Sequence, residues 1–294
     1  MGWQNNALVI GGSGFLGSYL LNSWNCLEIS RNRNRKVPLE DASKQFQDFV
    51  YSIKEFIENK KPNVVVNCIA LTSLEDCEAF PSKAWMINAE LPFLISEICD
   101  SASLPFVHIS SDAVFDGTGA PNTESSLANP LSIYGKSKYA GELAVIDSSE
   151  HNLILRTNFF GYSPNRQTLL NYFLKSFRNN EACPGYVDVL FNPIYIRDLV
   201  RAIAFLVERK RTGIVHATGL TDLSKYEFGV LVAESMYKDV KLVVPTTVSA
   251  SPSQVQRSKD LRMRSSLSFL NFEFKYSVSQ GIRDSIKTYG EEVR

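Results

Sequence analysis

The sequence predicts an α/β fold, with a doubly wound parallel sheet followed by a smaller C-terminal α/β lobe. Short apolar runs alternate with longer stretches of helical spacing through the first half of the chain, which is the pattern of consecutive βαβ units. A glycine-rich segment separates the first strand pattern from the first helix pattern. The alternation weakens after about residue 160. We therefore expect a dinucleotide-type domain over 1–160 and a substrate lobe over 161–294, with 190–215 returning to the first domain.

The strands predicted in the first half are short and rich in β-branched residues. They are expected at 7–10, 26–29, 64–69, 106–110 and 153–155. The run from 64 is continuous apart from Asn67, as expected of a strand that is buried on both faces.

The helices are predicted from apolar residues spaced three and four apart. They are expected at 15–24, 45–58, 83–100, 134–146, 168–177, 198–208, 224–237 and 279–289. Pro92 lies inside the third of these and predicts a kink or a break there.

Composition excludes several classes of protein. The 294 residues carry 31 Lys+Arg and 31 Asp+Glu, whereas a general nucleic-acid binder has an excess of basic residues. No apolar run approaches the roughly 20 residues of a membrane span, and the first residues, MGWQNN, do not read as a signal peptide. Five cysteines without a C-x-x-C pair favour neither a disulfide framework nor a metal site. We therefore expect a cytoplasmic protein with no nucleic acid, membrane or metal partner.

The segment GGSGFLG at 11–17 is typical of a phosphate-binding loop. Gly11 allows a tight turn, Gly14 lets the backbone approach a pyrophosphate, and Gly17 allows close packing of the helix on the strand. The helix that follows presents free N–H groups and a partial positive charge. A Rossmann-type domain is thus expected, with the cofactor contacted by these three glycines and by the intervening Ser13, Phe15 and Leu16.

The end of the second strand indicates which dinucleotide is bound. An NAD-binding domain usually has an acid there for the ribose 2′-hydroxyl. Here Ser30 and Arg31 follow the strand, and four basic residues lie within 31–36. We expect Arg31, with Ser30 as a hydrogen-bond donor, to hold a 2′-phosphate, which favours NADP(H) over NAD.

Three residues form a candidate proton relay. Tyr134 and Lys138 are four residues apart and share one helix face. An ammonium group nearby is expected to lower the phenol pKa from about 10. Ser111 lies at the carboxyl end of a predicted strand and is expected to bind the same substrate oxygen. Together these groups suit interconversion of a carbonyl and an alcohol.

The chain resembles the extended short-chain dehydrogenase/reductases, and within them the dTDP-4-dehydrorhamnose reductase-like group. The resemblance is collinear and covers nearly the whole chain. The matching segments are GGSGFLG (11–17), VVNCIALTSLEDCE (65–78), INAELP (87–92), SSDAVFDG (110–117), YGKSKYAGE (134–142), LRTNFFG (155–161), NPIYIRDLVRAI (192–203) and GIVHATG (213–219).

The resemblance implies roles for individual residues. Ser111 takes the Ser/Thr position, Tyr134 that of the proton donor and Lys138 that of the cation that binds the cofactor ribose. The resemblance also implies that the cofactor lies over Cys68, Ile69 and Ala70, and that the substrate contacts Thr72, Asp112, Asn158, Phe159 and Arg257.

The chain departs from the group at three positions on the substrate side. Ala113 stands where the group usually has Tyr, Phe159 stands where it has Trp, and Ser258 stands where Pro follows the Arg. These departures bear on the identity of the substrate more than on the chemistry.

The resemblance implies an NADPH-dependent reductase of a 4-keto-6-deoxy sugar nucleotide. One alternative is a non-catalytic NADP-binding regulatory subunit, because segment 223–228 is similar to the methionine adenosyltransferase β subunit, which keeps the Tyr/Lys pair. A nucleotide-sugar epimerase is another alternative, although epimerases usually hold NAD and the basic loop favours NADP. A dehydratase is disfavoured because Ala113 is not acidic. The amphipathic helices fit a homodimer contact or core packing equally well.

Overall fold

The computed structural model describes residues 3–29, 42–119, 121–250 and 255–292. Within these ranges the central sheet is wholly parallel and has the strand order β10-β5-β4-β3-β1-β2. Its strands are β1 Ala7–Ile10, β2 Leu27–Ile29, β3 Val64–Asn67, β4 Phe106–Ile109, β5 Leu153–Thr157 and β10 Gly213–Ala217. The predicted α/β fold with a parallel sheet is confirmed.

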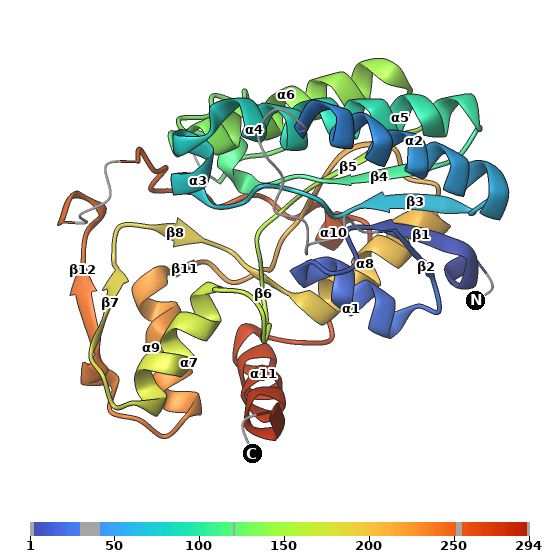
Figure 1. The fold of residues 1–294 in the computed structure, drawn as a ribbon. Coiled ribbons are helices and arrows are strands. Elements are labelled where there is room, and N and C mark those ends of the chain that lie inside the picture. The colour runs from blue at the N-terminus through green and yellow to red at the C-terminus, as the bar shows by residue number, and fades with distance from the viewer. Residues whose placement is uncertain (1–2, 30–41, 120, 251–254, 293–294) are drawn as a thin grey trace.

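Helices cover both faces of this sheet. In Figure 1, α2 Ala42–Lys60, α5 Leu91–Ser101 and α6 Ile133–Ser148 lie over one face, and α1 Phe15–Ser23 and α8 Ile196–Glu208 lie over the other. Successive residues of β1 point to opposite faces, so Leu8 and Ile10 pack under α2 and α5, whereas Ala7 and Val9 pack toward α1 and α8. The continuous apolar strands of the sequence are explained by this burial on both sides.

The third predicted helix is one continuous rod with a local change of pitch. It runs through α4 Pro81–Trp85, a π-helical turn at Met86–Glu90 and then α5. Pro92 lies in the first turn of α5, where a missing N–H is tolerated. The predicted break is therefore a wider turn ahead of the proline. Asn88 in this turn is buried and holds both backbone groups of Leu71, at 2.8 and 3.0 Å.

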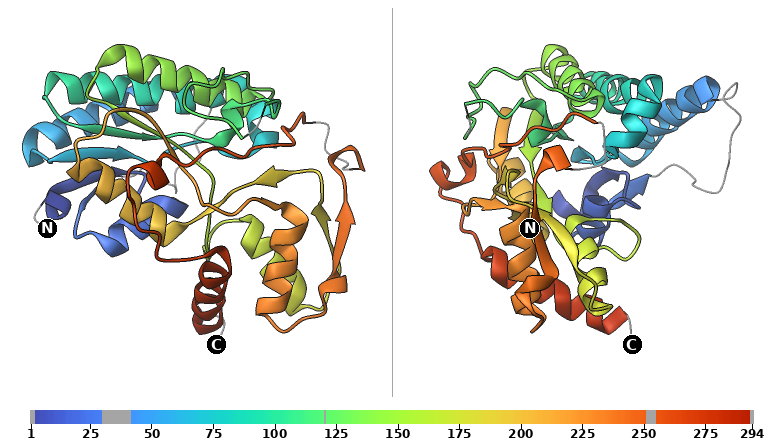
Figure 2. Two further views of the ribbon diagram at one scale, coloured as in Figure 1. Left: turned by 180° about the vertical axis from the view of Figure 1, so that it is seen from behind. Right: turned by 90° about the vertical axis from the view of Figure 1, so that its left-hand side faces the viewer.

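The second half forms a lobe beyond the carboxyl ends of the strands (Figure 2). It contains α7 Leu169–Arg178, α9 Lys225–Ser235, α11 Val278–Glu292 and the short strand pairs β7 Cys183–Tyr186 with β12 Val243–Thr246 and β8 Leu190–Phe191 with β11 Leu223–Ser224. The chain enters the lobe through β6 Phe159–Phe160, which pairs with β9 Ile194–Tyr195, and the short helices α3 Leu74–Ala79 and α10 Ser266–Phe269 complete the fold.

The lobe and the sheet share one apolar core. Phe173 and Phe228 of the lobe belong to the same buried cluster as Val9 and Leu155 of the sheet. The chain also crosses back, since α8 and β10 return to the main sheet. We propose that the dinucleotide-type domain and the substrate lobe meet at residue 160. Within the described ranges no helix has the length and apolar character needed to cross a membrane.

Candidate active site

The glycine-rich loop after β1 has the tight geometry that its sequence predicts. Gly11 has φ +91°, a conformation that favours glycine. The N–H of Gly14 donates to the Gly11 carbonyl at 2.9 Å. A Cβ on Gly17 would lie 2.3 Å from the same carbonyl oxygen. Helix α1 starts at Phe15 without a side-chain cap, so its first N–H groups are available to an anion.

The segment after β3 lies against this loop. The N–H of Cys68 donates to the carbonyl of Ile10 at 2.9 Å. A Cβ on Gly11 would lie 2.7 Å from Ile69. Ala70 is half-buried and Thr72 is exposed a little further along the segment. These backbone groups and the loop after β1 meet where β1 and β3 are neighbours, which is the point of a doubly wound sheet at which ligands bind.

Two residues directly after β2 were expected to select the dinucleotide. Ser30 and Arg31 lie outside the described residues. The structure adds Glu28 on β2, whose carboxylate is 2.6 Å from the place that a Cβ on Gly12 would take. Glu28 was not predicted as a site residue. Its place two residues before Ser30 was the signal that could have drawn attention to it.

The three predicted relay residues come from two adjacent elements. Ser111 follows β4 and caps the short helix Asp112–Val114, and its Oγ accepts the N–H of Ala113 at 3.2 Å. The same Oγ donates to Asp112 Oδ1 at 3.0 Å. Tyr134 and Lys138 lie on α6, and the Tyr134 phenol shares a hydrogen bond with Ser111. The strand end and the helix therefore bring the serine and the tyrosine together.

The electrostatics of Tyr134 differ from the expectation. Burial raises the pKa of Tyr134 to about 12, and the charge of Asp112 adds to the rise, while the hydrogen bond with Ser111 opposes it. The expectation that this pKa is lowered is wrong for the protein's own groups, because burial is the largest cause of the shift and raises the pKa. The phenol is therefore held protonated at neutral pH, as a proton donor requires.

Lys138 is directed at β4. Its Nζ donates to the carbonyl of Ile109 at 2.7 Å and lies 3.0 Å from His108 Nε2. Burial lowers the pKa of Lys138 to about 8, with Glu142 and Cys68 opposing the change. Burial, aided by the charge of Lys138, also keeps the pKa of His108 well below its ordinary value. In the sequence, His108 stands within an apolar run, which indicates only a packed core histidine.

Asp112 extends the cluster toward the lobe. Its Oδ2 accepts a hydrogen bond from Asn158. Burial raises the pKa of Asp112, although hydrogen bonds from Asn158 and Ser111 and the charge of Lys225 oppose the rise. Lys225 begins α9, and its Nζ lies 3.3 Å from the ring centre of Phe191. Burial lowers the pKa of Lys225 to about 8. From the sequence, Lys225 had no assigned role beyond its place in segment 223–228.

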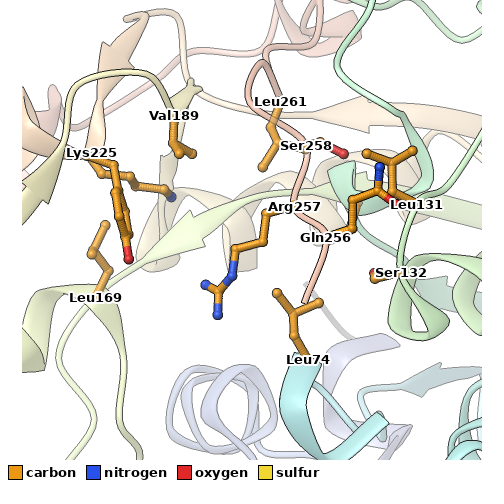
Figure 3. A pocket seen from close by; sticks show the side chains of 12 residues that line it. Leu74, Leu131, Ser132, Leu169, Val189, Lys225, Gln256, Arg257, Ser258 and Leu261 are labelled. Atoms are coloured by element: carbon orange, nitrogen blue, oxygen red, sulfur yellow. The ribbon is translucent and has the colours of Figure 1, made fainter. Parts of the chain in front are cut away.

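A cavity of about 210 Å³ opens beside this cluster. Its walls include Ala113, two residues after Ser111, and Ser132, two residues before Tyr134. Figure 3 shows the Lys225 and Arg257 side chains, which come from α9 and from the C-terminal segment and both line this space. The walls otherwise include Leu74, Leu131, Leu169, Tyr186, Val189, Gln256, Ser258 and Leu261.

The substrate residues implied by the resemblance are thus only partly gathered here. Arg257 lines the cavity and its guanidinium pairs with Glu75 at 2.5 Å. Asn158 reaches the cluster through Asp112. The Phe159 ring lies 5.3 Å from Phe15, and so packs against the helix that follows the glycine loop.

The comparison with protein families agrees with this geometry. The model of the RmlD substrate binding domain family matches residues 5–290. The chain belongs to this family. The resemblance to dTDP-4-dehydrorhamnose reductases is thereby confirmed, and the match spans the glycine loop, the relay residues and the cavity.

The similar proteins include reductases and a subunit of methionine adenosyltransferase 2. A dTDP-4-dehydrorhamnose reductase of Aggregatibacter actinomycetemcomitans is 28% identical over 265 residues, which cover 85% of this chain and 87% of the relative. The β subunit of methionine adenosyltransferase 2 from Xenopus laevis is also 28% identical, over 85% of this chain and 78% of that protein. A dTDP-4-dehydrorhamnose reductase from Bacillus anthracis, solved with NADP, has the same fold, with a TM-score of 0.84 at 21% identity over 96% of this chain and 98% of that one.

Proposed function

We propose that the protein is an NADPH-dependent reductase of a 4-keto-6-deoxy sugar nucleotide. The observation that carries the proposal is the Ser111–Tyr134 hydrogen bond, with Lys138 one turn further along α6, beside a glycine loop built for a pyrophosphate. The reductases named among the relatives support the substrate class.

The residues present fit a nicotinamide dinucleotide. The close packing of Gly11, Gly14 and Gly17 forms a tight turn that leads into the uncapped start of α1, where free N–H groups would bind the pyrophosphate, and the backbone at 68–70 flanks this turn. Arg31 is proposed to hold the 2′-phosphate and Lys138 the ribose. When bound, the reduced cofactor supplies the hydride to the C4 carbonyl carbon.

The protein's own groups complete the reduction. Ser111 binds the carbonyl oxygen, and Tyr134 donates its proton to that oxygen as the negative charge develops there. The raised pKa of Tyr134 ensures that the proton is present at neutral pH. The sugar nucleotide occupies the neighbouring cavity, where Lys225 and Arg257 suit its diphosphate.

The direct test is turnover with defined substrates. The purified protein should oxidise NADPH only when a dTDP-4-keto-6-deoxy sugar is added, and it should bind NADPH more tightly than NADH. UDP- and GDP-sugars in the same assay report the preferred nucleotide. Binding of neither dinucleotide would contradict the proposal.

Replacing Lys225 with Met should weaken substrate binding selectively. A hydrogen bond between charged groups contributes about 1.5–3 kcal/mol, so we expect KM for the dTDP-sugar to rise at least about tenfold while the Kd of NADPH stays unchanged. Lys241→Met, an exposed change in the same lobe, is the matched control. An unchanged KM in Lys225→Met would remove Lys225 from the substrate site.

A regulatory subunit is the second candidate function. The similarity to the methionine adenosyltransferase 2 β subunit supports it, as does the segment 223–228. If the protein is a regulatory subunit, we expect it to associate stoichiometrically with a methionine adenosyltransferase and to show no sugar-dependent oxidation of NADPH. An affinity pull-down combined with the turnover assay separates the two functions.

We also propose that the protein forms a homodimer through the outer face of α4–α6. Trp85, Phe93, Leu143 and Ile146 on these helices are each 37–45% exposed. Apolar side chains on adjacent helices suit a second copy of the same surface. The molar mass from light scattering should be that of a dimer for the wild type and that of a monomer for Leu143→Glu. A monomeric wild type would contradict the proposal.

A further inference from the structure

Three buried polar side chains form a chain of contacts that ends at Lys138. They are Asn67 on β3, His108 on β4 and Lys138 on α6, each at most 1% exposed. Asn67 Nδ2 is 3.3 Å from His108 Nδ1, and His108 Nε2 is 3.0 Å from Lys138 Nζ. The two strand residues are direct neighbours across the sheet. The imidazole therefore links the amide to the lysine.

The orientation of the Asn67 amide is fixed by the backbone. The N–H of Ile69 donates to Asn67 Oδ1 at 3.0 Å, and a backbone N–H is a donor only. The amide oxygen must therefore face Ile69, and the NH₂ group must face His108. Because NH₂ is also a donor only, His108 Nδ1 has to accept. The neutral ring then carries its proton on Nε2.

This tautomer has a consequence for Lys138. The Nε2–H of His108 points at Nζ, while Nζ itself donates to the carbonyl of Ile109. An ammonium group has three donors and no acceptor, so it would face Nε2–H as donor to donor. An uncharged amine has a lone pair and completes every bond in the chain. An ammonium group is satisfied only after the ring proton moves to Nδ1, and this move gives up the longer contact, 3.3 Å, between Nδ1 and the Asn67 NH₂ group.

We propose that the tautomer of His108 is coupled to the protonation of Lys138. The Nε2–H tautomer accompanies the amine, and the Nδ1–H tautomer accompanies the ammonium. In the conversion Lys138 Nζ takes up one proton from solvent, Nε2 loses a proton and Nδ1 gains one, so the net uptake is one proton. His108 acts through Lys138 and is a positioning residue.

The other titratable groups around Lys138 are Glu142, Cys68 and Tyr134, and the Glu142 carboxylate supplies the charge that favours the ammonium, because burial raises the pKa of Cys68 and of Tyr134 to about 12. Glu142 lies one turn further along α6, and Cys68 comes from the segment after β3. Tyr134 is on the same helix face. Asn67 and His108 oppose the effect of Glu142, because their hydrogen bonds favour the uncharged amine. In the proposed reductase the coupling would set the pH at which Lys138 can bind the ribose as a cation; this part rests on the proposed function, whereas the coupling itself does not.

The coupling can be tested without any substrate. The chain has only three histidines, so ring ¹⁵N NMR of the histidine-labelled full-length protein can resolve His108 by comparison with a His108→Phe sample. We expect the Nε2–H tautomer at alkaline pH and conversion to Nδ1–H as the pH falls through the pKa of Lys138, about 8. An Nδ1–H ring at every pH, or an Nε2–H ring at every pH, would overturn the proposal.

Two variants separate coupling from simple packing. Lys138→Met removes the ammonium, so His108 should keep the Nε2–H tautomer throughout the titration. Asn67→Asp replaces the NH₂ donor by an acceptor of the same shape, so Nδ1 should stay protonated throughout. The exposed ring of His151 supplies a reference signal in all samples. A pH-dependent tautomer change that persists in Lys138→Met would assign the proton to another group.

Discussion

Tyr134→Phe should lower the rate of sugar-dependent NADPH oxidation by about a hundred-fold to ten-thousand-fold, the range for loss of a general acid. The substitution removes one hydroxyl and keeps the ring that packs beside Ser111. Because the pKa of Tyr134 is raised to about 12, its proton is present throughout the neutral range. The measurement is kcat with saturating NADPH and substrate.

The control for this experiment lies on the same helix. Tyr139 packs against the apolar cluster of Val114, Phe115 and Met263, so Tyr139→Phe should keep nearly full kcat. The Kd of NADPH should be similar in both variants, which separates lost chemistry from lost cofactor binding. Full turnover by Tyr134→Phe would reject its role as the proton donor.

Glu142→Gln should lower the free energy of unfolding by about 3–5 kcal/mol, the usual cost of breaking a buried ion pair. The Arg156 guanidinium donates from Nε and Nη2 to the Glu142 carboxylate, with the shortest distance 2.7 Å, and Ser110 Oγ donates to it at 2.5 Å. Both charged side chains are at most 2% exposed. The variant leaves the Arg156 charge buried without its counter-ion.

Chemical denaturation followed by circular dichroism measures this loss. Glu58→Gln is the matched control, because its pair with Lys54 is 4.0 Å long and both side chains are more than half exposed, so it should cost under about 0.5 kcal/mol. Replacing both Glu142 and Arg156 by Met should recover part of the stability. Equal unfolding midpoints for Glu142→Gln and the wild type would contradict the prediction.

The sequence predicted the elements that carry local signals. Five of the six main-sheet strands and the predicted helices occur close to their expected ranges, because strand and helix periodicities appear in neighbouring residues. The sixth strand, β10 Gly213–Ala217, was not predicted. The glycine loop was predictable because the positive φ of Gly11 and the close contact between Gly17 and Gly11 depend on residues near each other in the sequence. The short strands of the lobe were not predicted. Strands of two to four residues carry little periodicity, and they form only by pairing with segments far along the chain.

The residues of the candidate site were predicted from the sequence, but the contacts between them were not. Ser111, Tyr134 and Lys138 were found from a strand end and a four-residue spacing. The sign of the Tyr134 pKa shift was wrong, because burial outweighs a lysine that is bonded to β4. Lys225 had no assigned role because nothing beside it in the sequence shows that it lies near Asp112, more than a hundred residues earlier.

The sequence by itself determined the α/β class, the phosphate loop and the residues of the relay, since each depends on side chains a few positions apart. Only the tertiary structure decided which atoms those residues contact. The parallel sheet places Asn67 beside His108, and α6 carries Lys138 onto the imidazole. Hydrogen bonds in a dry interior are selected by the donors and acceptors within reach, and the packing of distant segments decides which ones those are.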